Sequence, residues 1–443
     1  MPSWESNEEI QIFREYLQIP SVHPDIDYEP CIEFLKKQAK SLELPYNIYT
    51  PSGDPKKPIF IMTWIGTEPS LPSVVLNSHM DVVPVFPEKW THPPFSADVD
   101  SEGRIFARGS QDMKCVGVQY LAAIRALKKE GITLKRTIHI IFVPGEIKNK
   151  KSTPKKLIYR LTDEEIGGVD GMKVFVHAKE FKDLNAGFSL DEGLASENDV
   201  FAVYYAERSI WKVTFHCNGT AGHGSLLLHN TAGVKLNYIL NKMTEFRSEE
   251  SKKLDENPNL TIGDVTTVNL TMINGGVQSN VIPPLMSITF DVRIAIDRSL
   301  EEFESMVINN IYTPRNVIRI GVYWKKFFCS LVHRLAKEAG GDIDIEIGQK
   351  ELHAPVTKMD ATNKFWVAFK EAIDELGLKI RPQVFPGGTD SRFIRAVNIP
   401  AIGFSPIYNT PVLLHDHDEF LPVDVYLRGI EIYKKIIPKV ANI

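Results

Sequence analysis

The sequence has few cysteines, no long apolar run and little net charge. Its cysteines show no Cys-x-x-Cys spacing, so neither a disulfide framework nor a cysteine zinc site is expected at Cys31, Cys115, Cys217 and Cys329. No apolar run approaches the roughly 20 residues that cross a bilayer, and the acidic first segment does not resemble a signal peptide. The formal net charge of −5 over 443 residues favours neither a nucleic-acid nor a membrane partner. We therefore expect a cytoplasmic protein.

The length and the apolar runs predict an α/β protein of more than one domain. A chain of 443 residues exceeds one ordinary core, and 43% hydrophobic residues are typical of a globular protein. Short apolar runs predict strands at 58–66, 73–81 and 137–144. The last two are apolar nearly throughout, as in central parallel strands covered on both faces, and a helix is expected between them over 112–131. We predict a central mixed, mostly parallel sheet covered by helices.

The pattern changes near residue 206 and returns near residue 353. Between these positions the order strand, helix, strand, strand, helix predicts a small ferredoxin-like sheet with one open face. We therefore predict a discontinuous α/β domain, 1–205 and 353–443, with an inserted α+β domain over 206–352. The lysine-rich segment 145–162 and the segment 309–331 fit neither pattern, and we interpret both as atypical insertions.

Acidic and histidine side chains recur at the ends of the expected elements. They occur in the motifs "SHMD" (78–81), "GSQDMK" (109–114), "TDEEIGG" (162–168), "LDEG" (190–193) and "LLHDHDE" (413–419). Ligand sites of open α/β sheets lie beyond the carboxyl ends of the strands. Each motif alone is more often a structural or solvated feature, but together they predict a site for two divalent ions. Such a site needs a bridging carboxylate, terminal ligands and a free carboxylate that accepts a proton from water.

His79 and Asp81 illustrate how such a site is supported. A histidine ligand needs a hydrogen-bond acceptor on its second ring nitrogen to fix its tautomer. In an extended segment Asp81 lies on the same side as His79. We therefore predict that His79 binds a metal ion and that Asp81 orients His79.

The ordered motifs resemble those of the aminoacylases, within the two-zinc exopeptidase and amidohydrolase family. Besides the motifs above, the resemblance rests on "GHGS", "NVIPP" and "GGTDSRFIR" and covers nearly the whole chain apart from the two insertions. It implies a zinc exopeptidase-like fold with a lid and dimerisation domain. It also implies hydrolysis of N-acyl-L-amino acids, with acetyl or similar acyl groups and mainly aliphatic or neutral amino acids. The implied cofactors are two Zn²⁺ per subunit, with Co²⁺ or Mn²⁺ as possible substitutes.

The resemblance also implies a role for each residue of the metal site. His79, Asp112 and Glu192 would bind one zinc ion. Asp112, Glu165 and His415 would bind the other, with Asp112 bridging, and Glu164 would be the general base. Asp191 is an alternative to Glu192, since the two point to opposite faces of a strand and only one can reach the metal. The match to the aminoacylases favours Glu192.

Substrate contacts are implied in both domains. His223 of a homodimer would reach the partner subunit's site and polarise the scissile carbonyl, although a surface histidine is the simpler interpretation. Asn280 would bind the oxyanion or the substrate carboxylate. Arg392 would bind the carboxylate of the amino acid, with Gly388 allowing close approach of the backbone. For Arg293, a structural salt bridge is as plausible as a contact with substrate.

Two other functions remain open at this point. The same metal ligands would serve a related metallocarboxypeptidase or dipeptidase. The insertion 145–162 separates the strand at 137–144 from Glu164, where the family has a tight turn. The alternative outside the enzymes is therefore a catalytically impaired homologue that only binds its ligand.

Overall fold

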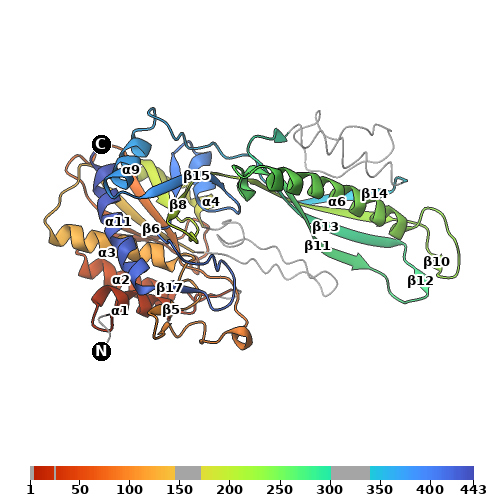
Figure 1. Cartoon of the computed structure of the whole chain (residues 1–443), viewed down its shortest axis with the longest axis horizontal. Helices are drawn as coiled ribbons and strands as arrows, with labels where there is room; N and C mark the ends of the chain where they lie inside the picture. The colour runs from red at the N-terminus through yellow and green to blue at the C-terminus, as the bar shows by residue number, and fades with distance from the viewer. Residues whose placement is uncertain (1–3, 24–25, 145–170, 301–339) are drawn as a thin grey trace. The chain divides into compact units, whose positions relative to one another are not determined.

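The protein divides into two compact units. The computed structural model describes residues 4–23, 26–144, 171–300 and 340–443 (Figure 1). The first unit comprises Met1–Ala206, Pro355–Gln383 and Thr389–Ile443, and the second comprises Glu207–Ala354 and Val384–Gly388. The predicted insertions 145–162 and 309–331 both lie outside the described residues.

An eight-stranded mixed sheet forms the centre of the first unit, as predicted. Its four middle strands are parallel to one another, whereas β1, β2 and β8 pair antiparallel. In spatial order the strands are β1 (Tyr46–Tyr49), β2 (Ile59–Trp64), β6 (Ile138–Val143), β3 (Ser73–His79), β7 (Ala186–Asp191), β16 (Ala401–Gly403), β8 (Val200–Glu207) and β15 (Lys379–Phe385).

Helices cover both faces of this sheet, which explains the continuous apolar runs. Along β2, Phe60 and Met62 pack into one core, and Ile59 and Ile61 pack into another. The first core contains α1 (Glu8–Leu17), α2 (Glu29–Ser41), α3 (Lys114–Lys129), α9 (Lys364–Glu375) and α11 (Val423–Ala441). The second contains α4 (Met172–Phe175), α5 (Lys179–Asp183) and α10 (Ser391–Ala396). No helix in the described part of the chain is long and apolar enough to cross a bilayer.

A small antiparallel sheet joins two distant parts of the first unit. It has the order β17-β5-β4, and Phe420 pairs with Phe106. The segments before "GSQDMK" and after "LLHDH" are thereby held side by side. The strands are β4 (Asp98–Val99), β5 (Arg104–Phe106) and β17 (Phe420–Pro422), and a 3-10 helix, η1 (Pro87–Lys89), precedes them.

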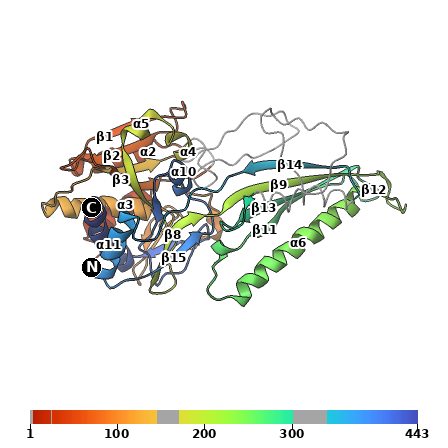
Figure 2. The same ribbon diagram turned by 90° about the horizontal axis from the view of Figure 1, so that it is seen from above.

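The second unit is an antiparallel sheet with a long helix on one face (Figure 2). Alternate residues of β9, among them Trp211, Val213 and Phe215, pack against Leu236 and Ile239 of α6. The order β11-β13-β9-β14 is that of the predicted ferredoxin-like sheet with β14 added at one edge. The elements are β9 (Ser209–Asn218), β10 (Gly222–His223), α6 (Ala232–Glu256), η2 (Ile262–Asp264), β11 (Thr267–Gly275), β12 (Val281–Ile282), β13 (Leu285–Ile294) and β14 (Ile343–Lys350).

Candidate metal centre

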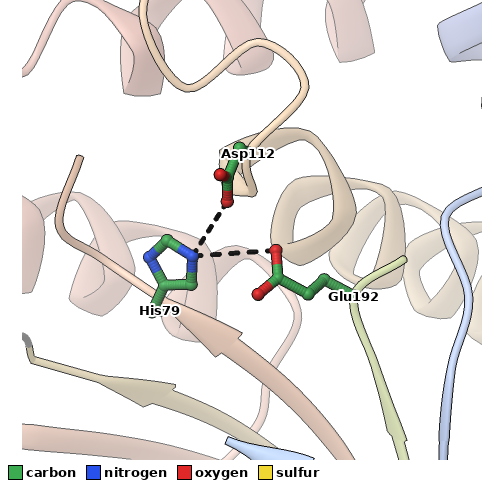
Figure 3. Close-up of side chains that lie close together, drawn as sticks. All are labelled: His79, Asp112 and Glu192. Atoms are coloured by element: carbon green, nitrogen blue, oxygen red, sulfur yellow. Dashed lines mark hydrogen bonds and ion pairs between the residues drawn. The ribbon is translucent and has the colours of Figure 1, made fainter. Parts of the chain in front are cut away.

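Three buried side chains of the first unit converge on one point. His79 ends β3, Glu192 directly follows β7, and Asp112 lies just before α3. Since β3 and β7 are parallel neighbours, their carboxyl ends meet at one edge of the sheet. One ligand atom from each of the three residues lies within 4.8 Å of the others (Figure 3). Histidine nitrogen and carboxylate oxygen are suitable ligands for zinc.

The two oxygen atoms of Asp112 face different imidazoles. His79 Nε2 lies 3.2 Å from Oδ1 of Asp112, and His415 Nε2 lies 3.3 Å from Oδ2. His79 Nε2 is also 3.8 Å from Oε2 of Glu192 (Figure 3). A carboxylate placed between two imidazoles in this way has the arrangement of a ligand that bridges two ions. The peptide bond between Asp112 and Met113 is cis.

Asp81 supports His79 from the side opposite Asp112. Its main-chain oxygen lies 3.0 Å and its Oδ1 3.3 Å from His79 Nδ1, and its Oδ2 lies 2.9 Å from His23 Nε2. Burial raises the pKa of Asp81, but the hydrogen bonds from His23 and His79 outweigh burial and hold that pKa below its usual value. The main-chain oxygen of Asp81, with the carboxylate charge beside it, holds the proton of His79 on Nδ1, so that Nε2 points a lone pair at the cluster.

The charges of the cluster fit a divalent cation. Burial and the neighbouring Asp112 raise the pKa of Glu192 well above its ordinary value. Burial also raises the pKa of Asp112, but the hydrogen bonds from His415 and His79 reverse this and lower it. Two buried carboxylates facing the same imidazole repel each other unless a cation lies between them. The donor set and its electrostatics therefore suit bound zinc.

His415 lies in a loop with an unusual backbone. Its φ of +62° is in the left-handed region that non-glycine residues rarely adopt. Its side chain remains 46% exposed, in contrast to the buried His79. Such backbone strain is commonly kept at functional sites, where surrounding contacts hold it.

Asp191 points away from the cluster, which favours Glu192 as the ligand. Its Oδ1 accepts from Asn77 Nδ2 at 3.1 Å and its Oδ2 accepts from Ser391 Oγ at 2.8 Å. Asn77 Nδ2 also donates to Asp390 Oδ2 at 3.2 Å. Burial and the charge of Asp191 raise the pKa of Asp390 to about 7. Asn77 thus links Asp191 to Asp390 through hydrogen bonds, next to the candidate ligand Glu192.

The other predicted site residues lie elsewhere or outside the described residues. Glu164 and Glu165 lie outside the described residues. In the second unit, exposed His223 has Nδ1 2.8 Å from Ser225 Oγ, and Asn280 accepts with its main-chain oxygen from Gly224 at 2.7 Å. Gly388 ends a segment of that unit. Arg392 lies in α10 of the first unit and donates from Nη1 to Thr389 O at 2.9 Å.

Arg293 forms the structural salt bridge that was the alternative to a substrate contact. Its Nε donates to Asp291 Oδ1 at 2.7 Å, and its Nη2 donates to Oδ2 at 3.2 Å.

Two supporting residues were not predicted from the sequence. His23 reaches Asp81 because residues 21–23 run beside 80–82, where Val22 and Val82 form a parallel bridge. Glu419 is fully buried and contacts the loop that carries Asp112. The sequence signal for His23 is weak, because a lone "VHP" resembles any turn. Glu419 is the last acid of the "HDHDE" motif, where one buried acid cannot be told from its solvated neighbours.

Comparison with known families identifies the group to which the chain belongs. The model of peptidase family M20/M25/M40 matches residues 75–439, which is most of the chain. The chain belongs to this family. It is 42% identical over 439 residues to Aminoacylase-1 of Homo sapiens, covering 99% of this chain and 97% of the relative. It is 40% identical to Aminoacylase-1 of Dictyostelium discoideum over 454 aligned residues, covering 100% of both chains.

Solved structures of M20 proteins share the fold. An M20 family metallo-carboxypeptidase from Sulfolobus solfataricus matches with a TM-score of 0.69 at 17% identity, covering 98% of this chain and 99% of that chain. A dinuclear metal binding peptidase of the M20 family from Bacillus subtilis matches with a TM-score of 0.61 at 13% identity, covering 98% of each. At these identities the likeness establishes the M20 fold of this chain.

Proposed function

We propose that this M20 protein hydrolyses N-acyl-L-amino acids to a carboxylate and a free L-amino acid. The observation that carries the proposal is the 42% identity to Aminoacylase-1 along almost the whole of both chains. The convergence of His79, Asp112, Glu192 and His415 supports it, because a hydrolase of this kind needs a metal centre at the end of the sheet. Acetyl or similar acyl groups and aliphatic or neutral amino acids are the proposed substrates.

The proposed cofactors are two zinc ions per subunit. His79 and Glu192 would bind one, His415 and Glu165 would bind the other, and Asp112 would bridge both. Bound divalent ions supply Lewis acidity that lowers the pKa of water and polarises a carbonyl group. The two-sided contacts of Asp112, at 3.2 and 3.3 Å to different imidazoles, support this assignment.

The proposed catalytic steps use the chain's own carboxylates. Glu164 takes a proton from the attacking water and later delivers it to the nitrogen of the leaving amine. The water oxygen forms a C–O bond to the acyl carbon, the acyl C–N bond then breaks, and the amine leaves as the free amino acid. Asp81 contributes by holding the ring of His79 in one orientation, which the contacts of Asp81 with His79 and His23 support.

Substrate binding and assembly are proposals that extend to the second unit. Arg392 would bind the substrate carboxylate, with Gly388 leaving space for it. His223 and Asn280 would bind the carbonyl oxygen across a homodimer, through the lid domain of residues 206–352. His223 is exposed and pairs with Val281, the residue after Asn280, and this proximity supports a shared role. The three described free cysteines, all buried, support a cytoplasmic location.

A substrate comparison tests the proposed function. The zinc-loaded protein should hydrolyse N-acetyl-L-methionine much faster than N-acetyl-D-methionine or a dipeptide. Faster cleavage of the dipeptide would instead identify a metallopeptidase, the alternative that the M20 fold also serves. Glu164→Gln should abolish hydrolysis while leaving the metal content unchanged. A wild-type protein that binds zinc but hydrolyses none of these substrates would indicate an impaired homologue.

A further inference from the structure

The carboxylate of Glu419 organises the loop that carries Asp112. It is fully buried and accepts three main-chain N–H groups, from Gly109 at 3.1 Å, Gln111 at 2.6 Å and Asp112 at 3.3 Å. Ser110 Oγ adds a longer contact at 3.4 Å. Gly109 has a φ of +90°, and a Cβ atom there would lie 3.0 Å from Val82 Cγ1, so this loop conformation requires glycine. The loop is therefore wrapped around one buried carboxylate.

Arg108 extends this contact to the loop of His415. Its Nη1 donates to Glu419 Oε2 at 2.8 Å, and its Nη2 lies 3.4 Å from the main-chain oxygen of His415. Both members of the ion pair are at most 2% exposed. Arg108 also lies over the ring of Trp90, at 5.1 Å from its centroid. The guanidinium of Arg108 thus holds the main chain of His415, which is the residue with the left-handed φ.

The side chain of Gln111 joins the same two loops a second time. Its Nε2 donates to Pro411 O at 3.1 Å and to Phe420 O at 2.9 Å, and its Oε1 accepts from Leu413 N at 3.1 Å. The loop from 411 to 420 is therefore fixed at both ends by one amide. Together with the β5–β17 pairing, these contacts leave little freedom in the spacing of the two loops.

We propose that Glu419 is a positioning residue that sets the spacing between Asp112 and His415. It holds the main chain of Asp112 directly and the main chain of His415 through Arg108. This inference rests on the proposed two-ion centre, in which Asp112 bridges both ions, His415 binds one of them, and His79 and Glu192 bind the other. Loss of Glu419 should therefore weaken binding of the ion beside His415 most, because Glu419 positions both Asp112 and His415. Binding of the ion beside His79 should weaken less, because His79 and Glu192 keep their own supports. Glu419 itself is not among the proposed ligands.

The test is metal binding by Glu419→Gln in the absence of substrate. Glutamine preserves the volume but turns one oxygen into an amide that faces N–H donors and loses the charge paired with Arg108. We expect two zinc affinities in the wild type, measured by competition with a chromophoric chelator. In Glu419→Gln one of them should fall about 10- to 100-fold while the other falls much less. The cobalt-substituted variant should show an altered absorption spectrum at the weakened site.

Glu250→Gln is the matched control. Glu250 is a buried glutamate of the second unit that accepts from Thr266 N at 2.8 Å and from Arg298 Nη2 at 2.9 Å. It has the same arginine partner type and the same main-chain acceptor role, but it belongs to the other unit. Glu250→Gln should lower the Tm and leave both zinc affinities intact. A general loss of stability is thereby separated from a specific loss of one ion.

A second variant covers the case in which Glu419→Gln does not fold. Glu419→Asp keeps the charge for Arg108 but withdraws the carboxylate from the main chain, so it should weaken the same ion to a smaller extent. If the wild type binds two ions and either folded Glu419 variant binds both with unchanged affinity, this inference alone is overturned. Equal weakening of both ions would overturn it too. A wild-type chain that binds fewer than two ions would overturn the proposed metal centre together with this inference.

Discussion

Replacing Asp81 by asparagine tests how the protein prepares His79 for metal binding. Asp81 is completely buried and its carboxylate lies 2.9 Å from His23 Nε2 and 3.3 Å from His79 Nδ1. Asparagine keeps the main-chain oxygen that accepts from His79 Nδ1, but it removes the negative charge that lies beside both imidazoles, and its amide group faces one of them. We therefore expect the loss of about one charge-assisted hydrogen bond, a free energy of about 2 kcal/mol.

That free energy corresponds to roughly a 30-fold weaker zinc affinity. The value agrees with the 10- to 100-fold losses typical of residues that orient a metal-bound histidine. The assay is competition for zinc with a chromophoric chelator, read against kcat/KM at limiting zinc. Both quantities should fall by similar factors, and saturating zinc should restore much of the rate.

His23→Gln is the control for this prediction. Glutamine still offers an N–H donor to Asp81, and the contact between Asp81 and His79 is untouched, so the effect should be much smaller. If Asp81→Asn binds zinc as tightly as the wild type, the argument that Asp81 prepares His79 is wrong. A larger loss in His23→Gln than in Asp81→Asn would contradict it as well.

Three further predictions concern the ligand choice, the pH dependence and the first insertion. Glu192→Gln should lose one zinc ion, whereas Asp191→Asn should keep both, as counted by elemental analysis; the reverse result would reassign the ligand. Burial lowers the pKa of His139 from 6.5 to about 4. Between these two pH values the unfolded chain binds more protons than the folded chain, so the free energy of unfolding falls as the pH falls. The total loss is at most roughly 3 kcal/mol. The Tm difference between wild type and His139→Gln should therefore change across this window, and a constant difference would contradict the assignment. Removing residues 145–162 should not lower kcat/KM for N-acetyl-L-methionine; an inactive deletion variant would show that the segment is needed.

The central sheet could be predicted because its sequence signal is local. β2, β3 and β6 are apolar runs bounded by polar residues, and burial on both faces selects for such runs. β14 was not predicted although its isoleucines alternate with acids from Ile343 to Ile347. β4, β5 and β17 have only two or three residues each, too few for a periodic pattern. Their pairing depends on contacts between segments far apart in sequence.

The candidate metal ligands could be located from the sequence more readily than the residues that support them. His79, Asp112, Glu192 and His415 stand out as polar residues at the ends of apolar elements, and the structure brings them together. Glu419 depends on a contact with Asp112 across 307 positions, which no local pattern encodes. Strand alternation shows only that one of the adjacent acids at 191 and 192 can reach the metal, and the resemblance to the aminoacylases was needed to favour Glu192.

The central claim is that distant parts of the chain hold two cations around Asp112. Anomalous scattering at the zinc absorption edge, measured on crystals of the zinc-loaded protein, tests this claim directly. We predict two peaks about 3.5 to 4 Å apart, one on each side of Asp112, with His79 and Glu192 at one and His415 at the other. A single peak, or peaks that do not contact Asp112, would contradict the account.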